Sequence, residues 1–238
     1  MIYRFLSKLA TQERLEAFPV PRPNSNMQER WGVGWVHFEK KFKPTMPIFQ
    51  QQGVKFWLAP SITDRPVGIS LRFHQGKEFE PLPDLWGVGG KLFISERAKK
   101  IIETHDELSH EYFPVEFIDY QERSLPNRQP YYWFIQRRFL TVTPSERIAK
   151  ATELGFYPAP YGEDFLARVK DSTNLKEQIG QIPLWQHLAE DIGKRSAKER
   201  SIVYFGPTLM AAFQEAQLGG LDVYSKKYGI GEESVCAI

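Results

Sequence analysis

Short hydrophobic runs broken by prolines characterise the first third of the chain and predict strands rather than helices. Strands are predicted over 33–42, 54–59 and 67–74, because each segment is rich in β-branched or aromatic residues and is bounded by turn residues. Proline fixes φ and removes a backbone donor, which disfavours long helices in this region. The prolines concerned lie in 19–23 and at Pro44, Pro47, Pro60, Pro66, Pro81 and Pro83. We therefore expect a strand-rich part over 1–90.

From residue 91 onward the hydrophobic pattern alternates between strands and amphipathic helices. After a short strand over 92–94, Ser95 is suited to cap the N-terminus of a helix that ends near Glu103. The helix has one apolar side and one charged side, as expected for a helix that covers a core. Further strands are predicted over 112–118, 131–142, 202–205 and 221–225. The segment 131–142 (YYWFIQRRFLTV) has the strongest strand pattern of the chain.

Caps and periodicity predict three more helices in the second part. Thr143–Glu146 has the form of a capping box, and its helix should end near Gly155. Another helix is predicted after Pro183, and one from Pro207 to about Leu218. The helix after Pro183 is predicted because its apolar residues share one face; they are Leu184, Trp185, Leu188, Ala189 and Ile192.

The succession of elements predicts an α+β fold. A strand-rich N-terminal part, 1–90, precedes a mixed part, 91–238, with three or four amphipathic helices. With 238 residues the two parts can be separate small domains or one continuous domain, and the pattern alone leaves both open.

Composition narrows the class of protein. Hydrophobic residues make up 42% and charged residues 25%, which is typical of a soluble globular chain. The net charge of +2 argues against a dedicated nucleic-acid binder, since such proteins need a dense cationic surface. No apolar run approaches the roughly 20 residues that span a bilayer, and the charged N-terminal segment does not resemble a secretory signal. With Cys236 as the single cysteine, an intramolecular disulfide is excluded and a cytoplasmic location is expected.

No catalytic or metal-binding motif is complete. Ser70 follows Gly68 but lacks the second glycine of a serine elbow, and Gly87–Lys91 lacks residues that a phosphate loop requires. His105 and His110 lie five residues apart, a poor spacing for metal ligands on one helix. We interpret 104–110 (THDELSH) as a solvated connector. No enzyme activity and no cofactor or metal are therefore expected.

One loop combines acidic and aromatic residues in a way that suits a protein interface. The candidate partner-binding residues in 78–86 (EFEPLPDLW) are Glu78, Phe79, Glu80, Asp84 and Trp86. Rings supply buried contact area, and carboxylates favour a basic partner. An ordinary surface loop with buried rings is the alternative. The basic run over 193–200 is interpreted as the solvated end of a helix.

Two stretches and the strand between them resemble a known family. KLFISERAKKIIETHDELSHEYFPVEF (91–117) and IVYFGPTLMAAFQEAQLGGLDVYS (202–225) flank YYWFIQRRFL. In this order they resemble a large bacterial family of immunity proteins from polymorphic-toxin systems, over about 90–225. The resemblance implies a cytoplasmic, non-enzymatic protein that binds one cognate toxin stoichiometrically and occludes it. The first ninety residues contribute little to this resemblance.

Two other classes of function remain open at this stage. The aromatic content, 14% of residues, equally suits a protein- or peptide-binding module unrelated to toxins. An enzyme whose site is assembled from distant residues, for example His74 with a carboxylate, is the second alternative. A toxin-like neighbouring gene would favour immunity, and a deep pocket would favour an enzyme. The identity of the toxin and the oligomeric state are not predicted.

Overall fold

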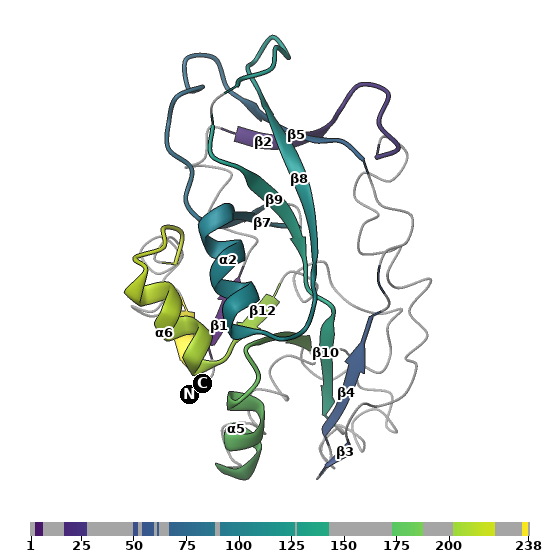
Figure 1. Cartoon of the computed structure of the whole chain (residues 1–238), viewed down its shortest axis with the longest axis vertical. Helices are drawn as coiled ribbons and strands as arrows, with labels where there is room; N and C mark the ends of the chain where they lie inside the picture. Colours follow the sequence, from purple (N-terminus) through teal and green to yellow (C-terminus); the bar gives the residue numbers. More distant parts are fainter. Residues whose placement is uncertain are drawn as a thin grey trace, which may run out of the picture.

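The strands form two mixed sheets, and each sheet contains strands from both halves of the sequence (Figure 1). The computed structural model describes residues 3–6, 17–27, 50–51, 54–59, 61, 67–88, 91–126, 128–142, 173–187, 202–221 and 235–237. The seven-stranded sheet has the order β13-β1-β12-β11-β10-β4-β3, and the six-stranded sheet has the order β2-β5-β8-β9-β7-β6. Three helices accompany them in the described part, and the fold is α+β as expected.

The bounds of the elements are as follows. The seven-stranded sheet contains β1 (Tyr3–Leu6), β3 (Gln50–Gln51), β4 (Val54–Leu58), β10 (Arg138–Val142), β11 (Leu184–His187), β12 (Ile202–Phe205) and β13 (Val235–Ala237). The six-stranded sheet contains β2 (Ala17–Pro21), β5 (Ile69–Phe73), β6 (Leu85–Val88), β7 (Lys91–Ser95), β8 (Glu111–Ile118) and β9 (Tyr131–Ile135). The helices are α2 (Glu96–His105), α5 (Thr173–Gly180) and α6 (Pro207–Glu215).

Several predicted elements are confirmed to within one to three residues. Strands predicted over 54–59, 67–74, 92–94, 112–118 and 202–205 correspond to β4, β5, β7, β8 and β12. Ser95 caps α2, since its side chain accepts a hydrogen bond from the backbone N–H of Ala98 at 3.2 Å. Helix α6 begins at Pro207 as predicted and ends at Glu215, after which two turn residues, 216 and 217, lead to Leu218.

The helix predicted after Pro183 is wrong at its start, because Leu184–His187 form strand β11. Leu184 and Trp185 pair with the antiparallel strand β12. The Trp185 ring stacks on Tyr204 of that strand, with centroids 4.1 Å apart and planes 7° from parallel. Apolar residues at helical spacing are equally compatible with a strand buried on both faces, and here the strand pairing prevails.

The segment 131–142, predicted as one strand, is two strands that belong to different sheets. Residues Tyr131–Ile135 form β9 in the six-stranded sheet, and Arg138–Val142 form β10 in the seven-stranded sheet. Gln136 and Arg137 carry the chain from one sheet to the other. This segment therefore connects the two sheets through two residues, Gln136 and Arg137.

Other predictions fall outside the described residues. They are the strand over 33–42, the helix over 143–155, the later part of the helix after Pro183, the basic run over 193–200 and residues 222–225 of the last strand. Strand β13, which contains Cys236 and pairs with β1, was not predicted. Both sheets join strands from before and after residue 90, for example β5 with β8 and β4 with β10.

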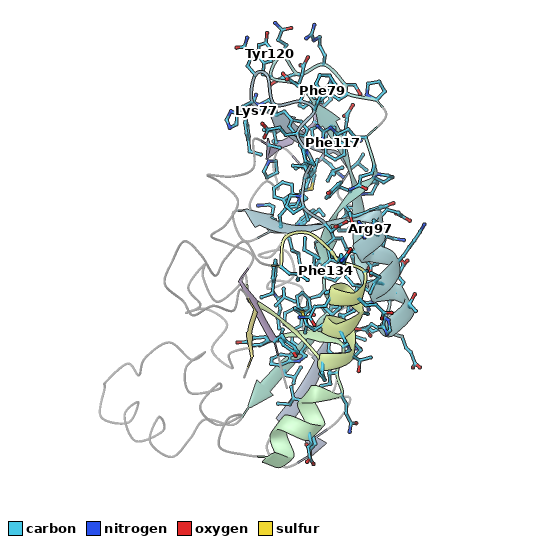
Figure 2. The ribbon with its side chains drawn as sticks, turned by 90° about the vertical axis from the view of Figure 1, so that its left-hand side faces the viewer. Lys77, Phe79, Arg97, Phe117, Tyr120 and Phe134 are labelled. Carbon is cyan, nitrogen blue, oxygen red and sulfur yellow. The ribbon has the colours of Figure 1, made fainter. Side chains whose placement is uncertain are left out.

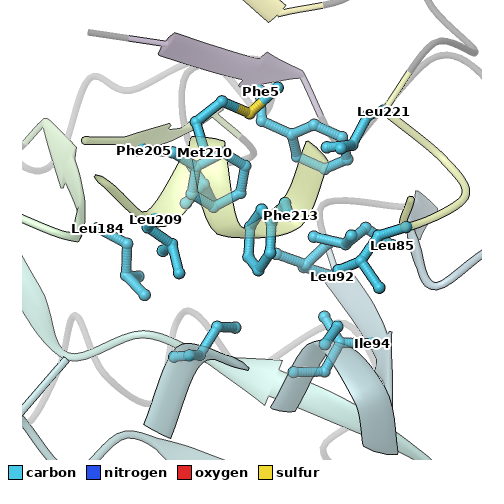
Figure 3. Packing of buried hydrophobic residues seen from close by; sticks show 14 of the residues in the cluster. Phe5, Leu85, Leu92, Ile94, Leu184, Phe205, Leu209, Met210, Phe213 and Leu221 are labelled. Atoms are coloured by element: carbon cyan, nitrogen blue, oxygen red, sulfur yellow. The ribbon is translucent and has the colours of Figure 1, made fainter. Parts of the chain in front are cut away.

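Two hydrophobic clusters lie on opposite faces of β7 and β9. Leu92 and Ile94 of β7 point into the first cluster, whereas Phe93 points into the second. Helix α2 packs on β7 and against α6 on the side of the first cluster (Figure 1). In Figure 3 Phe213 of α6 lies among Phe205, Leu209 and Leu92. A strand that is buried on both faces has consecutive apolar residues, which explains the run LFI (92–94) in β7.

The turn after α6 fastens that helix to the six-stranded sheet. The backbone N–H of Leu85 donates to the carbonyl of Gly219 at 3.0 Å. Gly220 has a φ of +99°, and a Cβ added to it would lie 1.9 Å from the carbonyl oxygen of Leu85. Only glycine fits this close approach. No helix in the described part of the chain is long and apolar enough to cross a membrane.

Candidate partner-binding site

The parallel pair β5 and β8 brings two distant turns to the same end of the six-stranded sheet. Arg72 near the end of β5 is in register with Ile118 at the end of β8. The chain therefore leaves both strands at the same edge, and residues 74–80 and 119–124 lie there together. We call these two turns the apex. Figure 2 shows Lys77, Phe79 and Tyr120 of the apex at one end of the molecule.

The first turn of the apex presents Phe79 to solvent. Its side chain is 91% exposed, the largest value among the exposed large hydrophobic residues in the described ranges. Glu80 beside it is exposed and pairs with Lys77 at 2.6 Å, and Glu78 is half-buried. An exposed aromatic ring offers a large apolar area that a protein partner can bury. Phe79 is thus the side chain of the predicted loop that a partner can reach most directly.

The backbone of this turn is held in place from below by Arg128. Its guanidinium donates to the carbonyl oxygens of Glu78 and Glu80, the latter at 2.8 Å. The same group lies 4.3 Å from the centroid of the Phe73 ring, so it is fixed by a cation–π contact as well. Lys77 N–H donates to the His74 carbonyl at 3.1 Å within the turn. These contacts hold the turn in one conformation.

Asp84 and Trp86, the other two residues predicted in this loop, lie inside the fold. Trp86 is 1% exposed and stacks on Phe93 with ring centroids 4.7 Å apart. The Asp84 carboxylate accepts hydrogen bonds from the Ser95 hydroxyl at 2.5 Å and from Gly219 N–H at 2.9 Å. A partner on the surface cannot touch either side chain in this structure. Both residues instead connect the loop to α2, α6 and β7.

The second turn of the apex was not predicted as part of the site. The Asp119 carboxylate accepts hydrogen bonds from the backbone N–H of Gln121 at 2.8 Å and of Arg123 at 2.9 Å. Glu122 has a φ of +65°, the left-handed conformation that closes the turn. Tyr120 is 40% exposed. The sequence DYQERS indicates a turn, but only the parallel pairing of β5 with β8 places it beside Phe79.

A second group of polar residues lies at the junction of the two sheets and is buried. Asp106 forms a two-pronged ion pair with Arg138, both nitrogen–oxygen distances being 2.8 Å. His110 Nε2 donates to Asp106 Oδ2 at 3.1 Å, and His110 Nδ1 accepts from the backbone N–H of Arg137 at 3.2 Å. Arg138 also donates to the Leu184 carbonyl at 2.9 Å. The interpretation of 104–110 as a solvated connector is therefore wrong for Asp106 and His110.

The electrostatics of this group follow from its burial and its partners. Burial lowers the pKa of His110, which outweighs the effect of the Asp106 carboxylate and keeps the imidazole neutral. Burial alone would raise the pKa of Asp106, but the hydrogen bonds from His110 and Arg138 hold it far below its usual range. Both ring nitrogens are engaged and the two side chains are 0% and 1% exposed. The arrangement of base and orienting carboxylate therefore joins the sheets and offers no nitrogen to a substrate.

The histidines and acids of the described ranges do not gather elsewhere. No group of three or more His, Cys, Asp and Glu side chains with the geometry of a metal site occurs among the residues that the structure describes. His105 is exposed at the end of α2, whereas His110 is buried.

The family of the chain follows from its sequence match, which covers most of the six-stranded sheet and both turns of the apex. The sequence pattern of the Immunity protein family (Imm11) matches residues 19–142, more than half of the chain. The chain belongs to this family, and membership implies a toxin-neutralising immunity function. No curated protein matches the chain.

The matched region corrects where the family pattern lies. The resemblance was placed over about 90–225, with little contribution from the first ninety residues. The match instead begins at residue 19 and ends at 142, so the two ranges share 90–142. Strands β5 and β6, the last three residues of β2 and both turns of the apex therefore fall within the family region.

Proposed function

We propose that this protein neutralises one cognate toxin by binding it stoichiometrically and covering a surface that the toxin needs for its activity. Membership of the immunity protein family supports the immunity function. The observation that carries the binding mechanism is Phe79, which is 91% exposed on a turn that Arg128 holds in place. An exposed aromatic ring on a turn whose backbone is held in place is the kind of residue that anchors protein interfaces.

The contact surface centres on Glu78, Phe79 and Glu80, with Asp84 and Trp86 as the support beneath the loop. A stable complex buries on the order of 800 Å² on each partner, so neighbouring turns must contribute as well. The buried support matters for affinity, because a loop that is already ordered loses little conformational entropy on binding. Asp84 and Trp86 thus affect toxin binding through the conformation of the loop.

Neutralisation by binding is favoured over an enzymatic activity. The best acid–base pair of the described residues, His110 with Asp106, is inaccessible and fully hydrogen-bonded. Cytoplasmic residence follows from the proposal, because an immunity protein must meet the toxin where the toxin acts. Nucleic acid and membrane are not expected as partners at a net charge of +2.

The proposal is tested with the protein encoded by the neighbouring reading frame. Co-expression in a sensitive host should restore survival, and the two proteins should co-purify as a one-to-one complex. With both proteins purified, residual toxin activity should fall linearly with added immunity protein and reach zero at an equimolar ratio.

Two results would contradict this proposal. Substoichiometric amounts that inactivate the toxin completely would indicate an enzyme. A neighbouring protein that is harmless alone, or that kills despite co-expression, would favour a binding module with another partner.

A further inference from the structure

We infer that the two turns of the apex form a single docking surface that recognises a protein partner through exposed rings rather than through charge. The inference rests on the proposed function and specifies the chemistry of the partner. The partner is a protein face with an apolar pocket that receives the Phe79 ring, flanked by a contact to Tyr120. The second turn, 119–124, is thereby assigned a role in binding.

The first step is that both rings are presented by ordered turns at one edge. Phe79 and Tyr120 are 91% and 40% exposed, and they lie at the same end of the molecule (Figure 2). Arg128 donates to carbonyls of the first turn, and Arg72 of β5, the strand that leads into that turn, pairs with Glu122 of the second turn. Asp119 fixes the second turn through its own backbone hydrogen bonds. A partner therefore meets two rings in a fixed relative position.

The second step is that the charges of the apex are largely neutralised within the protein. Lys77 forms an ion pair with Glu80, and Arg123 forms one with Asp119; the nitrogen–oxygen distance is 2.6 Å in both. Glu122 pairs with Arg72 of β5 at 2.9 Å. A surface whose charges are paired internally produces little long-range field, so it neither attracts nor orients a strongly basic partner. Contact area on the rings then dominates the affinity.

The third step is that most other large rings of the described chain are buried and unable to contribute. The largest fully buried side chains include Trp86, Phe73 and Phe93 of the six-stranded sheet. Val67, 62% exposed, is the remaining large hydrophobic residue that stands out from the described surface. It precedes the start of β5, whereas the apex follows the end of that strand. Val67 therefore supplies a matched control at the opposite end of the same strand.

The experiment measures the Kd of the full chain for the toxin encoded beside it, in the wild type and in single variants. Phe79→Ser should raise the Kd at least about 30-fold and Tyr120→Ser about 10-fold, the range of interface hot spots. Val67→Ser should change the Kd less than about threefold. Phe79→Leu, which keeps an apolar side chain, should be intermediate. Unfolding curves of the Phe79 and Val67 variants should match the wild type, because these residues are mostly exposed. Tyr120 is 40% exposed, so the Kd of Tyr120→Ser is measured at a temperature at which its unfolding curve shows a fully folded protein.

The salt dependence separates rings from charges. Raising NaCl from about 50 mM to about 0.5 M should change the wild-type Kd less than about fivefold, because screening affects only unpaired charges. Glu78→Gln should have a small effect. A steep salt dependence, or a larger loss in Glu78→Gln than in Phe79→Ser, would overturn the inference in favour of an electrostatic surface.

The failure of this inference is distinguishable from failure of the proposed function. If the wild type neutralises the toxin and Phe79→Ser and Tyr120→Ser bind as tightly as Val67→Ser, the docking surface lies elsewhere while the immunity function stands. If the wild type itself neither binds nor neutralises the toxin, both the function and the docking surface are overturned.

Discussion

Replacing Asp106 with asparagine should be among the most destabilising polar substitutions in this chain. The change keeps the volume of the side chain but removes the charge that Arg138 and His110 share at the junction of the two sheets. Removing one partner of a buried ion pair costs about 3 to 5 kcal/mol, because the other charge remains buried without compensation. The Arg138 side chain is 19% exposed, so water relieves part of that penalty and the lower end, about 3 kcal/mol, is expected.

A matched control is available on the adjacent helix. Glu103 pairs with Lys99 at 2.9 Å, but the Glu103 side chain is 46% exposed. Glu103→Gln removes a carboxylate from an ion pair in the same way, and exposed pairs of this spacing contribute about 0.3 to 0.5 kcal/mol. The two substitutions have the same chemistry and differ in burial.

The measurement is urea unfolding of the wild type and both variants at neutral pH, followed by the free energy of unfolding at zero denaturant. The expected loss for Asp106→Asn corresponds to a decrease in Tm of roughly 6 to 12 °C for a chain of this size. A loss below about 1 kcal/mol, indistinguishable from that of Glu103→Gln, would refute the argument that burial makes this ion pair important.

Two further predictions concern pH and backbone conformation. Burial depresses the pKa of His110 below its ordinary value of 6.5, so the unfolded chain takes up the proton first and the free energy of unfolding falls as pH drops below about 6.5. In His110→Gln this decrease should be shallower than in the wild type by up to about 1.4 kcal/mol per pH unit, and identical slopes would contradict it. Gly220→Ala should destabilise more than Gly76→Ala: both glycines have positive φ, but only the Cβ at 220 meets Leu85. Equal decreases in Tm for Gly220→Ala and Gly76→Ala would contradict this prediction, because they would show that the Cβ at position 220 no longer meets Leu85.

Local signals predicted much of the fold. Ser95 followed by a helical apolar pattern predicted α2, and Pro207 predicted the start of α6, because caps and periodicity depend on neighbouring residues. Leu184 and Trp185 show the limit of this reasoning. Their spacing fits a helix, but pairing with Phe205 and Tyr204 of β12 makes them a strand. That pairing joins residues about twenty positions apart, and no local pattern encodes it.

The candidate site was predicted in part for the same reason. Phe79 and Glu80 lie on the surface where the loop composition placed them, while Asp84 and Trp86 of the same loop are buried. The spacing of acidic and aromatic residues does not reveal which side chains point inward, because that depends on the strand β6 that begins at Leu85. Tyr120 was not named as a candidate, because its place at the same end of the sheet arises from the parallel pairing of β5 with β8.

The exposure of the rings at the apex has a consequence for how binding specificity can evolve. Phe79 lies outside both hydrophobic clusters, so exchanging it removes no contact from the core. Arg128, in contrast, holds the backbone of the first turn, so its loss would change the conformation of that turn whichever side chain stands at position 79. If the apex is the docking surface, as proposed, its exposed residues can accumulate substitutions that follow a changing partner while the sheet retains its stability. Selection for recognition and selection for folding would then act on different residues in this part of the chain.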